Sequence, residues 1–203
     1  MTTQPASASS ETIAATLDAL PDFPLLQGER VRLRGPRLDD ADALFAIFSA
    51  SAVMRYWSRP PMLVRDEAEK LIGEIDEGFR ARTLLNWMIV DATDAVIGTC
   101  TLFRFDPRHR RAELGYALHP AHWDRGLAHE ATTLALDWAF DTLRLHRIDA
   151  SIDPGNLASR QLLLRQGFVV EGCQRESFFV GDVVTDSELL GLLAADWRER
   201  HVA

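Results

Sequence analysis

The chain has 203 residues, of which 47% are hydrophobic, and its 30 acidic and 22 basic side chains give a formal net charge of −8. This length suits one well-cored domain and is short for two. The acidic balance excludes the basic surface that nucleic-acid binding needs, and no apolar run approaches the ~20 residues of a membrane span. We therefore expect no nucleic-acid and no membrane partner.

The N-terminal segment has neither the basic start nor the apolar middle of a secretory signal. The two cysteines, Cys100 and Cys173, lie far apart in strand-like runs and are expected to be buried free thiols in a reducing compartment. The sequence thus predicts a cytoplasmic protein. Residues 1–22 are expected to be a flexible extension of a single domain at 23–203, with a short helix over residues 13–20 as the alternative.

Hydrophobic periodicity predicts a strand, a helix and a loop in the first part of the domain. Residues 30–34 alternate in hydrophobicity as a strand does. The apolar residues Leu44, Ile47 and Phe48 recur at helical spacing and indicate a helix. Residues 54–61 combine aromatic side chains with prolines and cannot be helical.

A long acidic helix is predicted next, over residues 64–82. Its acidic side chains form either a solvated helix face or a negative rim that attracts a cationic amine. The sequence leaves both interpretations open.

The second half alternates strands and helices. The remaining predicted strands are 87–90, 96–105, 113–118, 146–152, 168–179 and 183–193, and the remaining predicted helices are 128–143 and 157–165. With residues 30–34 this makes about seven strands. The order predicts an α/β fold with a mixed sheet and helices on both faces.

The stretch from Glu113 to Ala128 carries the first functional signal. Gly126 lies just before a predicted helix, whose first amide N–H groups have no intrahelical partner and point the same way. Such a helix start binds phosphate, although a plain strand-to-helix turn is the alternative. Residues 153–159 form a second loop that opens a helix, so the two loops together fit one long phosphorylated ligand.

Four motifs follow one another in a recognisable order. They are Gly115-Tyr116, Pro120-Ala-His-Trp-Asp-Arg-Gly126-Leu-Ala, Asn156-Leu-Ala-Ser159 and Gly167-Phe-Val-Val-Glu-Gly172. Their order and spacing resemble the GNAT superfamily of acyl-CoA-dependent N-acyltransferases, and within it the branch of the ribosomal-protein N-terminal alanine and serine acetyltransferases. The likeness extends from about residue 26 to residue 197. One departure is Asp124, where that branch usually has glycine.

The resemblance implies a mostly antiparallel sheet with a splayed central strand pair, and it implies acetyl-CoA as the cosubstrate, with its pantetheine arm between those strands. It assigns pantetheine and acetyl contacts to the main chain of Leu118. The residues that would bind pyrophosphate are Trp123, Asp124, Arg125, Gly126, Leu127 and Ala128. Asn156 resembles a pantetheine-contacting asparagine, and its alternative role is to cap the helix that follows.

Acyl transfer to an amine needs a base for the amine, donors for the developing oxyanion and a proton for the departing thiolate. Orientation of the reactants supplies much of the rate, so no covalent enzyme intermediate is required. Ser159 resembles the family's proton donor. Glu113 is the candidate base, directly or through water, unless it faces solvent, and Glu176 is the reserve candidate.

Aromatic residues suggest an acceptor pocket. Tyr56, Trp57 and Trp87 either line it or belong to the core, and Glu176 is grouped with them as a substrate-binding residue. Three histidines, His119, His122 and His129, lie close in sequence but have no cysteine or carboxylate at ligand spacing, so no metal is expected.

The predicted function is transfer of an acetyl group from acetyl-CoA to a primary amine, with a protein or peptide N-terminus as the preferred acceptor. A small amine such as a polyamine, an amino sugar or an antibiotic is the alternative acceptor. A non-catalytic acyl-CoA-binding regulator is the alternative class. The protein is expected to be a monomer or a homodimer.

Overall fold

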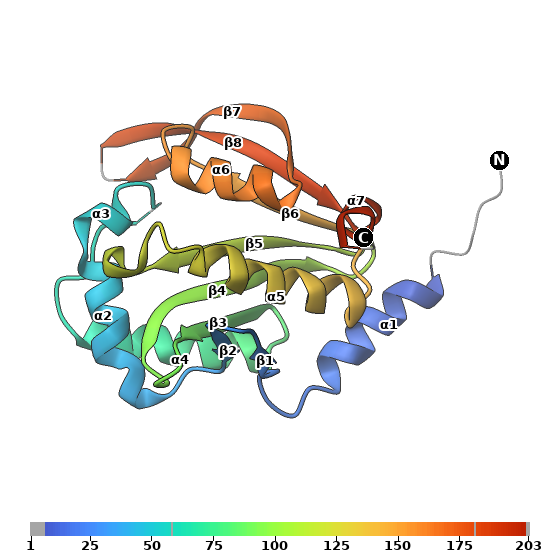
Figure 1. The fold of residues 1–203 in the computed structure, drawn as a ribbon, viewed down its shortest axis with the longest axis horizontal. Coiled ribbons are helices and arrows are strands. Elements are labelled where there is room, and N and C mark those ends of the chain that lie inside the picture. Colours follow the sequence, from blue (N-terminus) through green and yellow to red (C-terminus); the bar gives the residue numbers. More distant parts are fainter. Residues whose placement is uncertain (1–6, 58, 181, 202–203) are drawn as a thin grey trace.

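The computed structural model describes residues 7–57, 59–180 and 182–201. Within them, eight strands form one sheet in the order β1-β2-β3-β4-β5-β6-β8-β7. Of the neighbouring pairs, only β5 and β6 are parallel among the described residues. Helices cover both faces of this sheet (Figure 1), which confirms the predicted mixed, mostly antiparallel α/β fold.

The strands are β1 (Leu26–Gln27), β2 (Arg32–Arg34), β3 (Leu84–Val90), β4 (Val96–Asp106), β5 (Arg111–Leu118), β6 (Arg147–Ile152), β7 (Val169–Val180) and β8 (Val183–Leu193). The helices are α1 (Ser7–Asp18), α2 (Ala41–Ser49), α3 (Ser51–Met54), α4 (Asp66–Arg80), α5 (Leu127–Asp141), α6 (Leu157–Gln166) and α7 (Ala194–His201). Two short 3₁₀ turns, η1 (Leu38–Asp40) and η2 (Pro120–His122), complete the elements. The two-residue β1, too short to be detected from its sequence, makes the sheet eight strands wide.

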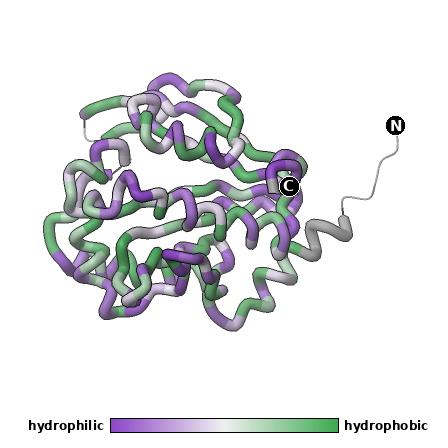
Figure 2. Tube along the Cα trace, in the orientation of Figure 1, coloured by the Kyte–Doolittle hydropathy of each residue, from purple (hydrophilic) through white to green (hydrophobic). Residues whose placement is uncertain are grey.

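Strand β3 shows how the sheet separates two hydrophobic layers. Trp87 and Ile89 pack in the core that contains α5, whereas Met88 and Val90 pack in the core that contains α2 and α4. Neighbouring side chains of a strand point to opposite faces, so an apolar run such as β3 serves both layers. Figure 2 shows hydrophobic segments along the strands and mixed segments on the covering helices.

Helix α1 belongs to the layer that contains α5. Ile13 and Leu17 are four residues apart, lie on one side of the helix and are both buried in this core. The guanidinium of Arg82 donates to the main-chain oxygens of Asp18 and Leu20, at 3.2 and 3.0 Å. These contacts attach the segment that follows α1 to the end of α4.

This arrangement differs from the flexible extension expected for residues 1–22. Residues 7–18 are helical, and the helix buries apolar side chains. The sequence-based prediction followed the polar composition of the first ten residues and gave too little weight to Ile13 and Leu17. One apolar face is enough to dock a short helix on a core. Residues 1–6 lie outside the described part of the chain.

Strands β5 and β6 diverge after a short parallel contact. Their pairing covers three residue pairs, from Arg111 opposite Arg147 to Glu113 opposite Asp149. Beyond that point β5 remains paired with β4, and β6 remains paired with β8. The sheet is therefore split between β5 and β6, inside the sheet, as the splayed pair was predicted to be.

Candidate active site

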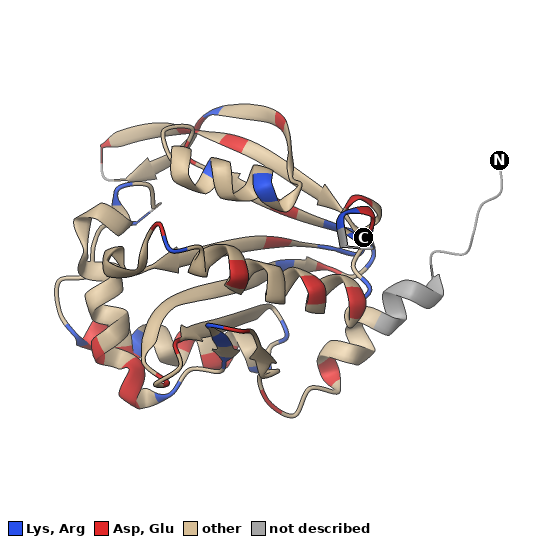
Figure 3. Ribbon diagram, viewed as in Figure 1, with Lys and Arg blue, Asp and Glu red and all other residues tan. Residues whose placement is uncertain are grey.

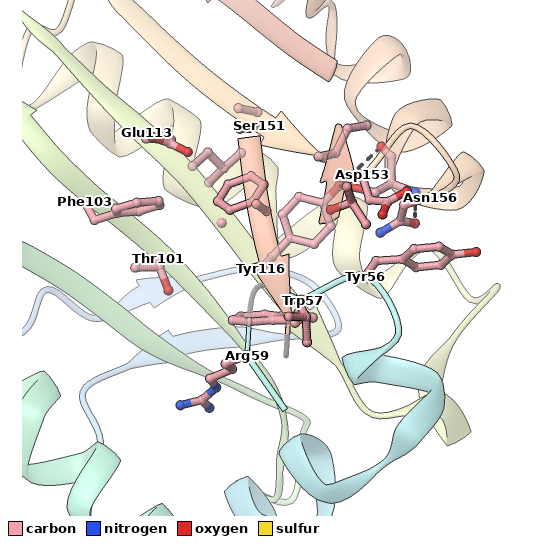
Figure 4. Close-up of a pocket in the computed structure, with 18 of the residues that line it drawn as sticks. Tyr56, Trp57, Arg59, Thr101, Phe103, Glu113, Tyr116, Ser151, Asp153 and Asn156 are labelled. Carbon is pink, nitrogen blue, oxygen red and sulfur yellow. Dashed lines mark hydrogen bonds between the residues drawn. The ribbon is translucent and has the colours of Figure 1, made fainter. Parts of the chain in front are cut away.

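A cavity of about 640 Å³ lies at this split. Four consecutive residues of β5, 113–116, contribute to its lining, and so do residues 150–153 at the end of β6 (Figure 4). Consecutive side chains of one strand lie on opposite faces of a sheet. A cavity bounded by all of them must therefore pass through the sheet between β5 and β6.

The two faces of the sheet contribute different chemistry to this cavity. On the face covered by α2 and α4, the lining residues of the sheet include Leu84, Asn86, Thr101, Phe103, Glu113 and Gly115. On the face covered by α5 and α6 the lining includes Leu114, Tyr116, Ser159 and Leu163. The carboxylate and the hydroxyl pair thus lie on opposite sides of the split.

Glu113 is largely shielded from solvent and holds an ion pair with an exposed arginine. Its Oε2 accepts a hydrogen bond of 2.8 Å from Arg104, while the side chains are 16% and 71% exposed. Arg104 has a φ of +52° and lies where the register between β4 and β5 shifts. Glu113 also lines the cavity, so its largely shielded side chain fits the predicted position of the base.

Tyr116 and Ser159 form a hydroxyl pair on the other side. The Tyr116 hydroxyl lies 2.7 Å from Ser159 Oγ, and either oxygen can be the donor. Burial raises the pKa of Tyr116, although the hydrogen bond with Ser159 partly counters it, so the phenol is protonated at neutral pH. Ser159 was predicted from the sequence. Tyr116 was quoted only as part of a motif, and its role as a partner of Ser159 was missed.

Asn156 has the capping role, one of the two that the sequence left open. Its side-chain oxygen accepts from the main-chain N–H of Ser159 at 3.1 Å, so it caps α6. It also lines the cavity. At the other end of α6, Gly167 has a φ of +99° and provides the predicted glycine C-cap.

The predicted acceptor-pocket residues separate into two groups. Tyr56 and Trp57 line the cavity. Trp87 does not: it is fully buried in the α5 core, and its indole N–H donates to the main-chain oxygen of Pro24, so its assignment as a pocket wall is wrong. Glu176 is exposed on β7 and is not among the lining residues, so its assignment as a substrate contact stays a prediction.

The alternation of β3 explains why Trp87 does not line the cavity, and it reveals a residue that was missed. Successive side chains of a strand point to opposite faces of the sheet, so Trp87 faces the α5 core and its neighbour Asn86 faces the cavity on the other side. Asn86 is the one polar residue in the run Leu-Leu-Asn-Trp-Met-Ile-Val. That signal was available in the sequence.

The proposed phosphate loop opens α5 as expected. Gly126 is the N-cap, has a φ of +74° and supplies no side-chain cap to the first turn. The residues 123–126 are exposed, while Leu127 is buried and Ala128 is half-buried. The start of the helix is therefore accessible and is not plugged by side chains of its own loop.

Arg30 fixes the orientation of this loop. Its guanidinium donates to the main-chain oxygens of Arg125 and Gly126 at 2.8 and 3.5 Å. The N–H and C=O of a trans peptide point in opposite directions, so the amides of Gly126 and Leu127 point away from Arg30. Two amides that share a direction at a helix start suit an anion.

Glu130, in the first turn of α5, holds Arg30 in place. Its carboxylate accepts from the main-chain N–H groups of Arg30 and Val31 and from the Arg30 side chain, at 2.7, 3.2 and 2.8 Å. Burial alone would raise the pKa of Glu130, but these hydrogen bonds outweigh it and lower the pKa. Acidic residues recur along α5 in Figure 3, and this one is structural. Neither Arg30 nor Glu130 was identified from the sequence.

Leu118, at the end of β5, is hydrogen-bonded to Trp123, the first residue of the loop. His119 donates its main-chain N–H to Ile97 of β4, so the main-chain groups of Leu118, one residue earlier, point to the opposite edge of β5, towards the split. The indole N–H of Trp123 donates to the main-chain oxygen of Leu118 at 2.7 Å. Residues 118 and 123–128 are outside the cavity lining and continue from the strand that carries it.

Asp124 occupies the position where the resembling branch has glycine. Its φ of +56° is in the left-handed region, where glycine is favoured, so the loop keeps the glycine conformation with an aspartate in it.

Among the described residues, no group of three or more side chains suited to a metal ion is found, and no helix is long and apolar enough to cross a membrane.

The sequence profile of the acetyltransferase (GNAT) domain matches residues 30–169. The chain belongs to the GNAT acetyltransferase family. It is an acetyl-transferring enzyme, and the predicted resemblance is confirmed. The N-acetyltransferase YoaA of Bacillus subtilis is 33% identical over 84% of this chain and 97% of its own length.

Other relatives of this GNAT acetyltransferase act on different acceptors. The ribosomal-protein-serine acetyltransferase of Escherichia coli is 30% identical over 47% of this chain and 54% of its own length. A spermidine N-acetyltransferase from Vibrio cholerae, solved in complex with CoA and spermine, has a TM-score of 0.74 and 26% identity, over 83% of this chain and 98% of that one. The family match therefore fixes the reaction type and leaves the acceptor open.

Proposed function

We propose that the enzyme transfers the acetyl group of acetyl-CoA directly to a primary amine of a protein or peptide N-terminus. The observation that carries the proposal is the cavity that passes through the sheet, with a carboxylate on one side and a hydroxyl pair on the other. Two substrates that enter from opposite faces would meet in the split. That arrangement is what transfer within a ternary complex requires.

The residues present fit the cosubstrate. The amides of Gly126 and Leu127, oriented by Arg30, would hold the pyrophosphate, together with the exposed loop from Trp123 to Ala128. The main chain of Leu118 and the side chain of Asn156 would contact the pantetheine arm. When bound, acetyl-CoA supplies an activated thioester.

The groups on each side match the proton transfers of the reaction. The amine nitrogen forms a bond to the thioester carbon while the carbon–sulfur bond breaks. Glu113 takes the proton from the amine, directly or through water, and Ser159 gives a proton to the departing thiolate. Tyr116, hydrogen-bonded to Ser159 Oγ, can replace that proton.

A covalent acetyl-cysteine is not needed in this proposal. Cys100 is buried in the core, and burial raises the pKa of its thiol to about 12, so it is protonated at neutral pH. Cys173 is exposed on β7, contrary to the buried thiol that was expected. No cysteine is among the described residues that line the cavity.

A turnover screen tests the acceptor. Thiol release from acetyl-CoA is measured with peptides that begin with serine or alanine, with spermidine and with amino sugars. We expect the highest kcat/KM for a peptide, while faster turnover of spermidine would reject the N-terminal acceptor.

A substitution in the loop tests the cosubstrate site. Gly126→Glu places bulk and negative charge at the loop and should abolish CoA binding, measured by calorimetry. An unchanged Kd for CoA would reject the loop assignment.

A further inference from the structure

Two buried polar atoms without a hydrogen-bond partner lie on the wall of the same cavity. Among the side chains of the described residues, the buried atoms left unpaired are Arg59 Nε and Asn86 Oδ1. Both residues line the cavity at the split. Leaving such an atom unpaired costs about 1–3 kcal/mol, and native proteins rarely do so without a functional reason.

Asn86 lies on the cavity floor, on the face covered by α2 and α4. It is opposite Thr101 of β4, and Thr101 is opposite Gly115 of β5, so the three form a row across the sheet. Two strand spacings separate Asn86 from Gly115, which is about 10 Å. Glu113 belongs to the neighbouring row. Asn86 is therefore too far from the split to touch the reacting amine itself.

Arg59 lines the cavity away from Asn156, at the end where the proposed function would place the acceptor. Its guanidinium carbon is 4.9 Å from the ring centre of Phe48 and 6.0 Å from that of Trp57. In Figure 4 it lies beyond Trp57, at the opposite end of the labelled residues from Asp153 and Asn156. Burial lowers the pKa of Arg59, and Glu74 and Glu67 of α4 only partly counter this.

Two arginines that line the cavity, Arg59 and Arg55, have no ion pair among the described residues. Arg55 lies over the ring of Tyr56, 5.2 Å from its centre, and also lines the cavity. Within the described part of the chain, no ion pair is found for Arg55 or Arg59, whereas Arg104 is paired with Glu113. The Arg59 guanidinium, which no carboxylate pairs directly, disfavours a second ammonium group on the acceptor next to it.

We propose that Arg59 and Asn86 form a remote acceptor subsite, in which the Arg59 guanidinium donates to an oxygen of the acceptor and the Asn86 amide oxygen accepts from an N–H group. This inference rests on the proposed function and names the feature of the acceptor that the enzyme selects. A peptide offers both groups in its backbone. A polyamine offers N–H groups and positive charge but no oxygen.

The distance sets the length of the preferred acceptor. An extended chain advances about 3.3–3.6 Å per residue, so about 10 Å corresponds to the third residue from the amine. A single amino acid amide cannot reach the subsite. The oxygen against Arg59 can be a main-chain carbonyl or a side-chain carboxylate, and these two sources need separate tests.

The experiment compares four amines with the full-length enzyme: Ser-Ala-Ala amide, Ser-Ala-Asp amide, serinamide and spermidine. The wild type should have a higher kcat/KM for both tripeptides than for serinamide. A further gain with Ser-Ala-Asp amide assigns the Arg59 partner to a carboxylate, and equal values assign it to the main chain.

Two variants test the residues. Asn86→Leu and Arg59→Met should each lower kcat/KM for the tripeptides by about 10-fold to 100-fold through a higher KM, and leave serinamide turnover and CoA affinity unchanged. Arg59→Met should also raise turnover of spermidine. Lys70→Met removes one positive charge from the exposed face of α4 and is the matched control, expected to change none of these ratios.

The outcomes are distinguishable from failure of the proposed function. If either variant lowers turnover of serinamide and tripeptide equally, or changes neither, the subsite is overturned while acetyl transfer stands. Wild-type preference for spermidine over the tripeptides would overturn both the subsite and the N-terminal acceptor, while acetyl transfer to an amine would stand. CoA binding without thiol release for every amine would overturn the subsite and the proposed reaction together.

Discussion

Asp124 places a conformational cost and a negative charge at the same position. Its positive φ costs about 1 kcal/mol relative to glycine, and its carboxylate lies two residues before Gly126. We expect Asp124→Gly to raise the free energy of unfolding by about 1 kcal/mol and to lower the Kd for CoA. Asp124→Asn, which removes only the charge, should tighten CoA binding without the full gain in stability. Denaturant unfolding and calorimetry measure both, and an identical Kd for all three proteins would contradict the role of the charge.

Glu113 and Glu176 offer a matched comparison, because one borders the cavity and the other is exposed outside it. Removal of a general base lowers turnover by about 10²–10⁴-fold. Glu113→Gln should therefore lower kcat at neutral pH and leave the Kd for CoA unchanged, whereas Glu176→Gln should change neither. A pH–rate profile that is the same for Glu113→Gln and the wild type would remove Glu113 from the mechanism.

The Ser159 and Tyr116 hydroxyls can be separated by single substitutions. Ser159→Ala should lower kcat by about 10²-fold, since the thiolate loses its nearby proton donor, while Tyr116→Phe should have a smaller effect because it removes only the replacement proton. Single-turnover kinetics at saturating CoA measure both. If the tyrosine variant is the slower of the two, Tyr116 rather than Ser159 is the donor.

At the scale of elements, the turn between β1 and β2 is joined to the start of α5 by Arg30 and Glu130. This contact shapes the loop that would hold the cosubstrate, and it spans 100 residues of sequence. A local pattern can indicate that Gly126 precedes a helix, because helix ends have their own residue preferences. It cannot indicate which distant arginine orients the loop.

Glu130→Gln tests this contact through its pH dependence. The folded-state pKa of Glu130 is below its ordinary value of 4.5, so the carboxylate stabilises the fold above that pH and loses this contribution as the pH falls through the folded-state pKa. The wild type should exceed Glu130→Gln in free energy of unfolding at pH 7, and the difference should shrink towards pH 3. CoA affinity at pH 7 should also weaken. A difference that is constant with pH would mean that the charge of Glu130 does not stabilise the loop.

At the scale of the whole molecule, the sequence predicted the order of the elements well because strands and helices here have clear periodicity and marked ends. The aromatic residues were harder to assign. The sequence does not distinguish Trp57, which lines the cavity, from Trp87, which is buried in the core. The pairing of β3 within the sheet determines that Trp87 is buried. Helix α1 was undervalued because its apolar residues become meaningful only against the core that receives them.

Helix α1 provides a test at this scale. Ile13 is fully buried in the α5 core, so Ile13→Ala should lower the free energy of unfolding by about 2–5 kcal/mol. Ala15 is exposed on the same helix, so Ala15→Ser serves as the control and should cost far less. Equal stability of the wild type and Ile13→Ala in urea unfolding would mean that α1 is not docked in solution.

The through-sheet cavity also predicts the order in which the two substrates bind. Where donor and acceptor approach from opposite sides, neither has to wait for the other to arrive or leave. Initial-velocity plots should then intersect, dead-end inhibitors should be competitive only against the substrate they mimic, and the order of addition should be random.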